Sequence, residues 1–200
     1  MELLVIRHGQ SEADILHVIE GRADFELTEL GHRQAQCMAE WVGARYRLTG
    51  IFASPLKRAA QTARHLQQKT QATLAFDEDL MEFQNGLIAG LPREEANRRY
   101  PAPSVKHPHT ALYEMESMIQ FRMRAETALS RILHEQDADA VIAIVAHGGI
   151  ITRLFQSFLA LPVATEVAIA TGDTGIHHWR VDGARRQIVF ANSQRHLEEM

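Results

Sequence analysis

Residues 140–149 of the chain read AVIAIVAHGG, and this stretch decides the class of fold. Its first seven residues are apolar at every position instead of at alternate positions. That pattern is typical of a parallel strand that is covered on both faces. His147 and two glycines follow directly, so polar chemistry is expected at the carboxyl end of this strand, the edge of an α/β sheet where ligands bind.

Strands and helices are expected to alternate along the rest of the chain. Short strands are predicted at 3–6, 51–53 and 73–76, helices after Thr28, around 121–132 and around 150–159, and a hairpin over 175–191. A further helix is predicted to open at Ser54 and Pro55, as its N-cap and first residue. The alternation predicts one α/β domain over residues 1–200, a three-layer α/β/α sandwich with a mainly parallel sheet. A small lid or insertion is expected around residues 85–115, which include the turn-rich stretch 100–109.

The composition is that of an ordinary globular protein of 200 residues, with 46% hydrophobic and 23% charged residues. Its net charge of −4 offers no global basic field to nucleic acid or a membrane surface. The single cysteine, Cys37, excludes an internal disulfide and a four-cysteine zinc site, and it fits a reducing compartment. No signal-peptide pattern opens the sequence, and its longest apolar run is seven residues, far short of the ~20 that span a bilayer. We therefore expect a cytoplasmic protein that binds neither nucleic acid nor a membrane.

Two strands are expected to end in related chemistry. The first strand runs into Arg7-His8-Gly9, and strand 140–146 runs into His147-Gly148-Gly149. Glycine lets backbone N–H groups approach a ligand closely, and an adjacent arginine can clamp a phosphate with two hydrogen bonds. One histidine of this kind would indicate a structural residue, whereas two at the same edge of a sheet favour a phosphate site.

These residues and three further segments resemble the histidine phosphatase superfamily, whose fold is phosphoglycerate mutase-like. The further segments are Gly21-Arg22-Ala23-Asp24 with residues 27–31, the run SPLKRAAQTA over residues 54–63, and Glu82. Their order and spacing agree with the family along most of the chain, and the segments around His8 and Arg58 are the most specific. The resemblance implies a phosphoric monoester hydrolase of this family.

The resemblance also implies a mechanism and a set of site residues. His8 would attack phosphorus and form a phosphohistidine. Arg7, Arg58 and His147 would hold the equatorial phosphate oxygens, on which the charge of the transition state is spread. Glu82 would protonate the leaving oxygen and then take a proton from the attacking water. Seven further residues are expected to bind substrate, namely Gly9, Gln10, Ser11, Asp14, Gly21, Arg22 and Gly148.

No metal or cofactor is expected, because two arginines and a histidine already supply positive charge at the site. The histidine pairs at 107 and 109 and at 177 and 178 lack the ligand spacing of a zinc motif and are expected to be ordinary loop and strand residues. The expected partner is a small phosphorylated substrate, and nothing in the sequence marks an oligomer interface.

The chain departs from the family pattern in its substrate-facing segments. Asp14 stands where family members commonly have an asparagine that contacts phosphate. Met81, Ile88 and Ala89 replace an arginine, a tryptophan and a second glutamate around Glu82. The carboxyl of Asp14 could pair with Arg7 or Arg22, stay protonated and donate a hydrogen bond, or cap a helix that begins near Ile15. These departures indicate a retained chemistry and an altered substrate pocket.

Three functions fit these features. The leading hypothesis is a metal-independent phosphatase acting on a small phosphorylated metabolite. The second is a cofactor-dependent phosphoglycerate mutase, which uses the same phosphohistidine but tends to carry extra segments that exclude water, and here only residues 85–115 are available for that purpose. The third is a phosphate-ligand binding protein with weakened catalysis, which Asp14 and the altered segment around Glu82 favour.

Overall fold

The computed structural model describes residues 1–104 and 107–198, and its centre is a six-stranded sheet in the order β3-β2-β4-β1-β5-β6. The strands are β1 (Glu2–Arg7), β2 (Gly50–Ala53), β3 (Thr73–Phe76), β4 (Val141–Ala146), β5 (Ile176–Asp182) and β6 (Arg185–Ser193). Strands β1 to β4 pair in parallel, and β5 and β6 continue the sheet antiparallel beyond β1. The mainly parallel sheet expected from the sequence is confirmed.

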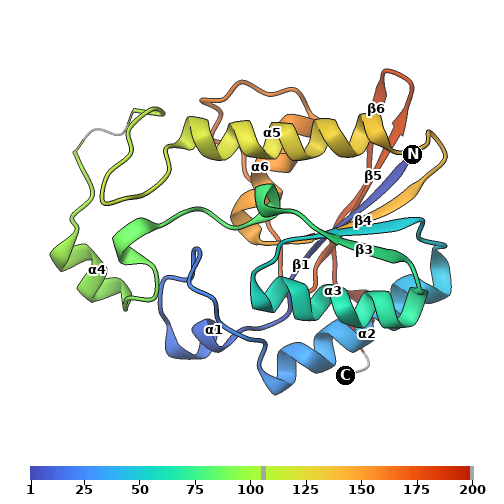
Figure 1. Ribbon diagram of the computed structural model, residues 1–200, viewed down its shortest axis with the longest axis horizontal. Coiled ribbons are helices and arrows are strands. Elements are labelled where there is room, and N and C mark those ends of the chain that lie inside the picture. The colour runs from blue at the N-terminus through green and yellow to red at the C-terminus, as the bar shows by residue number, and fades with distance from the viewer. Residues whose placement is uncertain (105–106, 199–200) are drawn as a thin grey trace.

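Helices cover both faces of this sheet, which gives the three expected layers (Figure 1). The helices are α1 (Glu12–Leu16), α2 (Glu29–Arg45), α3 (Lys57–Thr70), α4 (Arg93–Arg99), α5 (Met118–Glu135) and α6 (Gly148–Phe158), with short 3₁₀ turns at Glu78–Leu80, Gly86–Ile88 and Arg195–Leu197. Helices α2 and α3 share one buried cluster with the sheet, and α5 and α6 share the other. None of the helices in the described residues is long and apolar enough to cross a membrane.

The all-apolar strand is explained by this double cover. Along β4, Ile142 and Ile144 belong to the cluster under α5 and α6, whereas Ala143 and Val145 belong to the cluster under α2 and α3. Successive side chains of a strand point to opposite faces, so each position of a central strand must be apolar. Strand β1 lies beside β4 and follows the same rule, which places the carboxyl ends of both strands next to each other.

Two predicted helix starts differ in their outcome. Thr28 is the N-cap of α2 as expected, and its hydroxyl accepts a hydrogen bond from the Gly31 N–H at 3.0 Å. The predicted start at Ser54 and Pro55 is wrong, because α3 begins at Lys57 with Leu56 in the N-cap position. The N–H of Ser54 instead donates to the Val145 carbonyl of β4 at 3.0 Å, which keeps this residue in an extension of the sheet.

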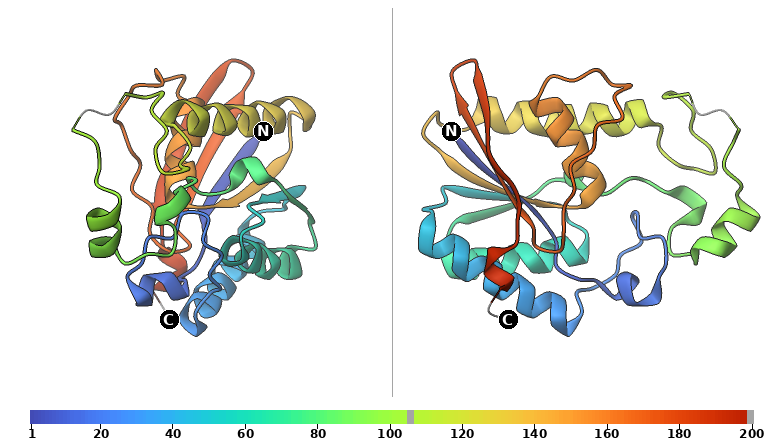
Figure 2. Two further views of the ribbon diagram at one scale, coloured as in Figure 1. Left: turned by 60° about the vertical axis from the view of Figure 1, so that its left-hand side comes forward. Right: turned by 180° about the vertical axis from the view of Figure 1, so that it is seen from behind.

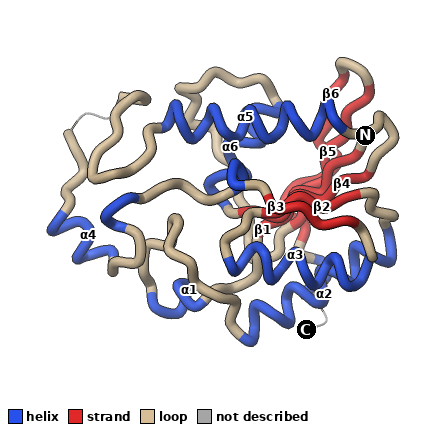
Figure 3. The backbone as a smooth tube through the Cα atoms, in the orientation of Figure 1, coloured by secondary structure: helices blue, strands red, loops and turns tan. Residues whose placement is uncertain are grey.

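The segment predicted as a lid stands beyond the carboxyl ends of the parallel strands. It contains the 3₁₀ turn Gly86–Ile88 and helix α4, and Figures 2 and 3 show α4 and its neighbouring loops on the side of the molecule away from the strands. Gly86 is required here, because its φ is +52° and a Cβ would lie 2.0 Å from the Tyr113 carbonyl oxygen. Residues 105 and 106 of the predicted lid lie outside the described residues, and a lid over 85–115 stays a prediction.

Candidate active site

His8 follows the last residue of β1 and is almost fully buried. Its Nδ1 lies 2.7 Å from the Gly9 carbonyl oxygen, and since a carbonyl oxygen only accepts, Nδ1 carries the proton. Nε2 then keeps its lone pair, and the Arg58 Nε–H donates to it at 3.3 Å. Burial lowers the pKa of His8 well below its usual value, and the charges of Arg58 and Arg7 add to this effect. The imidazole is therefore neutral and presents a nucleophilic nitrogen.

Arg58 lies in the first turn of α3 and is fully buried. Its terminal nitrogens donate to the carbonyl oxygens of Gly21 at 2.8 Å and Ala23 at 3.0 Å, so the loop before α2 fixes the guanidinium against His8. Burial lowers the pKa of Arg58, but an arginine starts so high that it stays charged near neutral pH. Gly21 contributes its backbone here, and this is the contact that the structure assigns to it.

His147 follows the last residue of β4 and lies beside His8, with 5.0 Å between the two ring centroids. Its Nε2 is 2.8 Å from the Ser54 hydroxyl, which itself accepts a hydrogen bond from the Leu56 N–H. The hydroxyl hydrogen can therefore be donated to Nε2, which leaves the proton of His147 on Nδ1. That buried Nδ1 has no hydrogen-bond partner among the described residues, and a phosphate oxygen would supply one. Burial lowers the pKa of His147 well below its usual value, with Arg58 adding to the shift.

Arg7 is the last residue of β1, and its guanidinium lies among carboxylates and a carbonyl. It donates to the Thr171 carbonyl oxygen at 3.0 Å and lies 3.5 Å from Asp173 and 4.0 Å from Asp14. Its Nε is buried without a partner among the described residues. The Asp173 contact was not predicted from the sequence, because a lone aspartate in a loop carries no pattern.

Glu82 is held against the first turn of α6. Its two oxygens accept hydrogen bonds from the N–H groups of Phe83 at 2.7 Å and Gly149 at 2.8 Å. A Cβ at Gly149 would lie 2.3 Å from Oε1, so only glycine lets the carboxylate approach this closely. Arg124 of α5 fixes the preceding chain by donating to the carbonyl oxygens of Asp79 and Glu82, both at 2.9 Å.

Glu20 is a site residue that sequence reasoning missed. Its Oε1 lies 3.4 Å from Arg58 Nε and accepts a hydrogen bond from the Ser11 hydroxyl, and its Oε2 lies 3.9 Å from His8 Nε2. Burial raises the pKa of Glu20, although Arg58 acts against this shift. A phosphoryl group on His8 would share this space. The available signal was its position directly before Gly21, in the segment that resembles the family.

The loop after His8 is packed against helices α2 and α3. The Gly9 N–H donates to the Thr62 hydroxyl at 3.1 Å, and the Gln10 N–H donates to the Gln34 side chain at 2.8 Å. A Cβ at Gly9 would lie 2.5 Å from the Gly31 carbonyl oxygen, so glycine is required for this close contact. In this structure both residues shape the loop, and their contact with substrate stays a prediction.

Of the three roles considered for Asp14, the structure shows the pairing with Arg7, and Asp14 also takes part in a helix cap other than the expected one. Its Oδ2 accepts hydrogen bonds from the Ser11 N–H at 2.8 Å and the Ser11 hydroxyl at 3.1 Å, and its Oδ1 faces Arg7. The expected helix start near Ile15 is wrong, because α1 begins at Glu12 with Ser11 as its N-cap. Asp14 is thus the third helical residue, from which a carboxylate can reach back to the N-cap.

The two other predicted substrate contacts border the same space. Arg22 Nε lies 3.4 Å from the Glu82 carbonyl oxygen, and burial lowers its pKa, with Arg124 adding to the effect. Gly148 opens α6, and a Cβ there would meet no atom within 4 Å. The N-terminal end of α6 therefore faces room that an anion could use.

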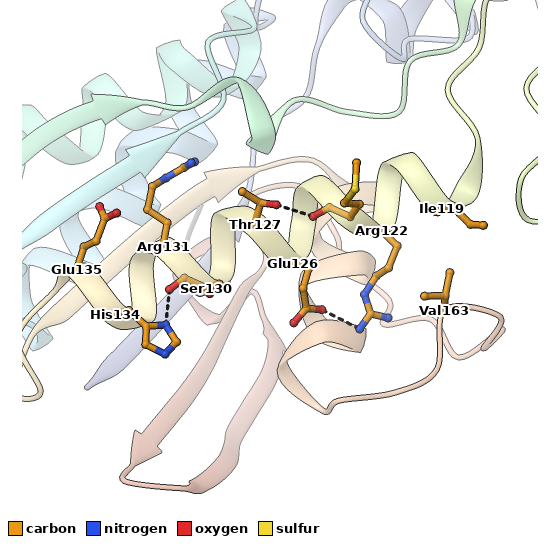
Figure 4. Close-up of a pocket in the computed structure, with 10 residues that line it drawn as sticks. Ile119, Arg122, Glu126, Thr127, Ser130, Arg131, His134, Glu135 and Val163 are labelled. Carbon is orange, nitrogen blue, oxygen red and sulfur yellow. Dashed lines mark hydrogen bonds and ion pairs between the residues drawn. The ribbon is translucent and has the colours of Figure 1, made fainter.

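Two other features of the described residues stand apart from this site. No group of three or more histidine, cysteine, aspartate or glutamate side chains in them could hold a metal ion. A groove of about 790 Å³ runs along α5. Figure 4 shows residues that line it, with Arg122 paired to Glu126 and His134 hydrogen-bonded to the Ser130 carbonyl. None of the five predicted catalytic residues is among the residues that line this groove.

Comparison with known proteins places this geometry in a family. The sequence model of the histidine phosphatase superfamily (branch 1) matches residues 3–194. The chain belongs to the histidine phosphatase superfamily. In this histidine phosphatase, His8 contacts Arg58 and lies beside His147 at the carboxyl ends of β1 and β4. Arg7 directly precedes His8, and Glu82 accepts a hydrogen bond from the Gly149 N–H, two residues after His147.

Relatives of known name include phosphatases. The chain is 31% identical to phosphoglycerate mutase-like protein 4 of Arabidopsis thaliana, over 99% of this chain and 87% of that protein. It is 30% identical to glucosyl-3-phosphoglycerate phosphatase of Mycobacterium tuberculosis, over 88% of this chain and 82% of that protein. The solved structure of the mycobacterial enzyme with VO3 has a TM-score of 0.84 at 28% identity, covering 96% of this chain and 98% of that one. The comparisons confirm the predicted family, its fold and a phosphoric monoester hydrolase.

Proposed function

We propose that this chain is a metal-independent phosphatase that hydrolyses a small phosphorylated metabolite through a phosphohistidine on His8. The observation that supports it most is the tautomer of His8, which is neutral and has its Nδ1 proton held by the Gly9 carbonyl. The lone pair on Nε2 points toward the Arg58 guanidinium, where a phosphate oxygen would also bind. A nucleophile and its anion site thus meet at one place.

In the first step, Nε2 of His8 attacks phosphorus while the bond from phosphorus to the ester oxygen breaks. Arg7, Arg58 and His147 bind the three equatorial oxygens, on which negative charge is spread. Glu82 donates a proton to the leaving oxygen, so the alcohol departs neutral. The products of this step are the alcohol and a phosphohistidine.

In the second step, water attacks the phosphorus of the phosphohistidine. Glu82 accepts the proton of that water, and the bond from phosphorus to Nε2 breaks. Inorganic phosphate leaves and neutral His8 is regenerated. Two guanidinium groups supply the positive charge that a metal ion supplies in other phosphatases, and neutral His147 donates a hydrogen bond from Nδ1, so no metal is required.

A mutase remains a second candidate, which the mutase-like relative from Arabidopsis thaliana favours. It would use the same phosphohistidine and transfer the phosphoryl group to a hydroxyl of the substrate instead of to water. A phosphate-binding protein without catalysis would keep Arg7 and Arg58 as anion ligands and form no phosphohistidine.

The test is a rapid-quench experiment with a ³²P-labelled aryl phosphate, with and without EDTA and 2,3-bisphosphoglycerate. We expect an acid-labile, base-stable phosphoprotein and steady release of phosphate in EDTA. The label should be absent in His8→Ala and retained in His134→Ala, an exposed histidine on α5. Label on a serine or aspartate would overturn the mechanism, bisphosphoglycerate-dependent transfer between hydroxyls would indicate the mutase, and phosphate binding without label would indicate the binding protein.

A further inference from the structure

A pocket of about 630 Å³ lies between the segment predicted as a lid and helix α6. Its walls come from Phe83, Ile88 and Asn97, from the segments 100–103 and 107–118, and from α6 with residues 163–168 of the loop that follows it. Figures 1 and 2 show that loop and the chain before α5 running close to each other at the amino end of α5. Most of the side chains around the pocket are apolar or aromatic, among them Phe83, Ile88, Tyr100, Leu112, Met115 and Met118.

None of the five predicted catalytic residues lines this pocket, but its wall includes the residue that follows the proposed proton donor, Glu82. Phe83 lines the pocket, directly follows Glu82, and donates its N–H to the Glu82 carboxylate at 2.7 Å. Thr152 and Arg153 line the pocket from α6, one helical turn beyond Gly148 and Gly149. The Gly149 N–H donates to the other oxygen of Glu82. Helix α6 therefore both holds the Glu82 carboxylate and forms part of the pocket wall.

The order of groups in the reaction decides what such a pocket would hold. In a phosphoryl transfer, the attacking and leaving atoms lie roughly in line on opposite sides of phosphorus. His8 attacks from one side, so the leaving oxygen faces Glu82, which protonates it. A pocket whose wall includes Phe83, which holds the Glu82 carboxylate, is therefore next to the side of the leaving alcohol.

Three charged side chains of the described residues line the pocket, namely Glu116, Arg153 and Glu166, among a majority of apolar and aromatic ones. Glu116 is neutralised by Arg124 at 2.6 Å. The Arg153 guanidinium donates to the Gln156 side chain at 2.8 Å and lies over the Phe121 ring, 5.7 Å from its centroid, while its Nε is buried without a partner among the described residues. The pocket therefore offers a hydrogen-bond donor to a polar group on an otherwise apolar alcohol. A volume of this size suits a ligand far larger than a three-carbon alcohol, since pockets for drug-sized molecules span about 300–1,000 Å³.

We infer that the substrate of this chain is the phosphate monoester of a bulky, mainly apolar alcohol, whose body binds in this pocket. The inference rests on the proposed function for the reaction and on the pocket for the alcohol. Apolar surface that leaves water on binding stabilises the complex in proportion to its area. Ile88 and Leu112, which line the pocket, would then determine specificity.

The test compares unbranched alkyl phosphates from ethyl to decyl phosphate. Their alcohols have nearly the same leaving-group ability, so the chemical step is constant and chain length alone varies. We expect kcat/KM to rise by up to about fourfold for each methylene that becomes fully buried, and then to level off when the pocket is full. Alkylphosphonates of the same lengths, which cannot be hydrolysed, should show the same trend in binding by calorimetry.

Two variants and a matched control locate the effect. Leu112→Asp places a charge in the pocket wall at a side chain that is 37% exposed, and Leu159→Asp makes the same change at 39% exposure outside it. The measured quantity is kcat/KM for octyl phosphate divided by kcat/KM for ethyl phosphate. We expect Leu112→Asp to reduce this ratio at least tenfold and Leu159→Asp to leave it unchanged. Ile88→Trp should retain ethyl phosphate and lose octyl phosphate, because the indole fills the space.

The outcomes separate this inference from the proposed function. A flat response to chain length in both turnover and phosphonate binding would overturn the apolar pocket, even if ethyl phosphate is hydrolysed through His8. Equal effects of the two Asp variants would also overturn it. Chain-length-dependent phosphonate binding without any phosphohistidine would support the pocket and refute the proposed reaction.

Discussion

The Glu20→Gln variant tests whether the negative charge of Glu20 weakens the binding of phosphate at this site. Oε2 of Glu20 lies 3.9 Å from Nε2 of His8, the proposed nucleophile, and Oε1 lies 3.4 Å from Nε of Arg58. A phosphoryl group bonded to His8 would therefore come into contact with this side chain. Two unit charges ~4 Å apart repel by about 4 kcal/mol at an effective dielectric constant of 20. This value applies to each unit of charge on the phosphoryl group and sets the scale of the effect.

Glu20 can escape part of that repulsion by binding a proton or turning away. Burial already raises its pKa, and a bound dianion acts in the same direction. We therefore expect Glu20→Gln to tighten phosphate binding about tenfold near neutral pH, which corresponds to ~1.4 kcal/mol. The glutamine oxygen can still accept the Ser11 hydrogen bond, and Arg58 keeps the carbonyl oxygens of Gly21 and Ala23.

The assay is competitive inhibition by inorganic phosphate and by vanadate between pH 5 and pH 8. Both proteins are compared at each pH, so the titration of the inhibitor cancels in the ratio of inhibition constants. The gain in Glu20→Gln should grow as pH rises, because the carboxylate charge is present above its folded pKa and lost below it. Glu135→Gln, an exposed residue of α5, should show no gain at any pH. Weaker inhibition of Glu20→Gln at every pH would mean that the carboxylate organises Arg58, and the repulsion argument would be refuted.

Three further results are expected. Asp14→Asn keeps an oxygen for the Ser11 N–H, so activity should persist. Inhibition by phosphate should become tighter, but less so than in Glu20→Gln, because the Asp14 carboxylate faces Arg7. Weaker inhibition by phosphate would contradict this. Gly149→Ala should lower kcat for ethyl phosphate about a hundredfold by displacing Glu82, and unchanged turnover would argue against the position of that carboxylate. Burial lowers the pKa of His177 and His196 to about 4. Each buried neutral histidine contributes to the free energy of unfolding, fully above pH ~6.5 and progressively less as pH falls toward 4. Urea unfolding should therefore show that free energy decrease by an amount on the order of 3 kcal/mol for each histidine. The His177→Gln variant should show a weaker pH dependence.

The local order of strands and helices could be predicted because its signals are local. The unbroken apolar run of β4 indicates burial on both faces, and Thr28 caps α2 as its residue type predicts. The positions of His8 and His147 at one edge of the sheet follow from two parallel strands ending in the same direction. The resemblance to the family added Arg58 and Glu82, which no periodicity marks.

The contacts between distant segments were decided only by the tertiary structure. Ser54 was expected to cap a helix, but its N–H extends the sheet and its hydroxyl meets His147, because β2 lies beside β4. Glu20 reaches Arg58 and His8 through a loop whose backbone also holds Arg58, and a single glutamate in a loop carries no pattern. Sequence patterns report which face of an element is buried, since burial repeats with the period of the backbone. The pairing of charges and hydrogen bonds across loops has no such period, so it depends on how the packed elements bring those loops together.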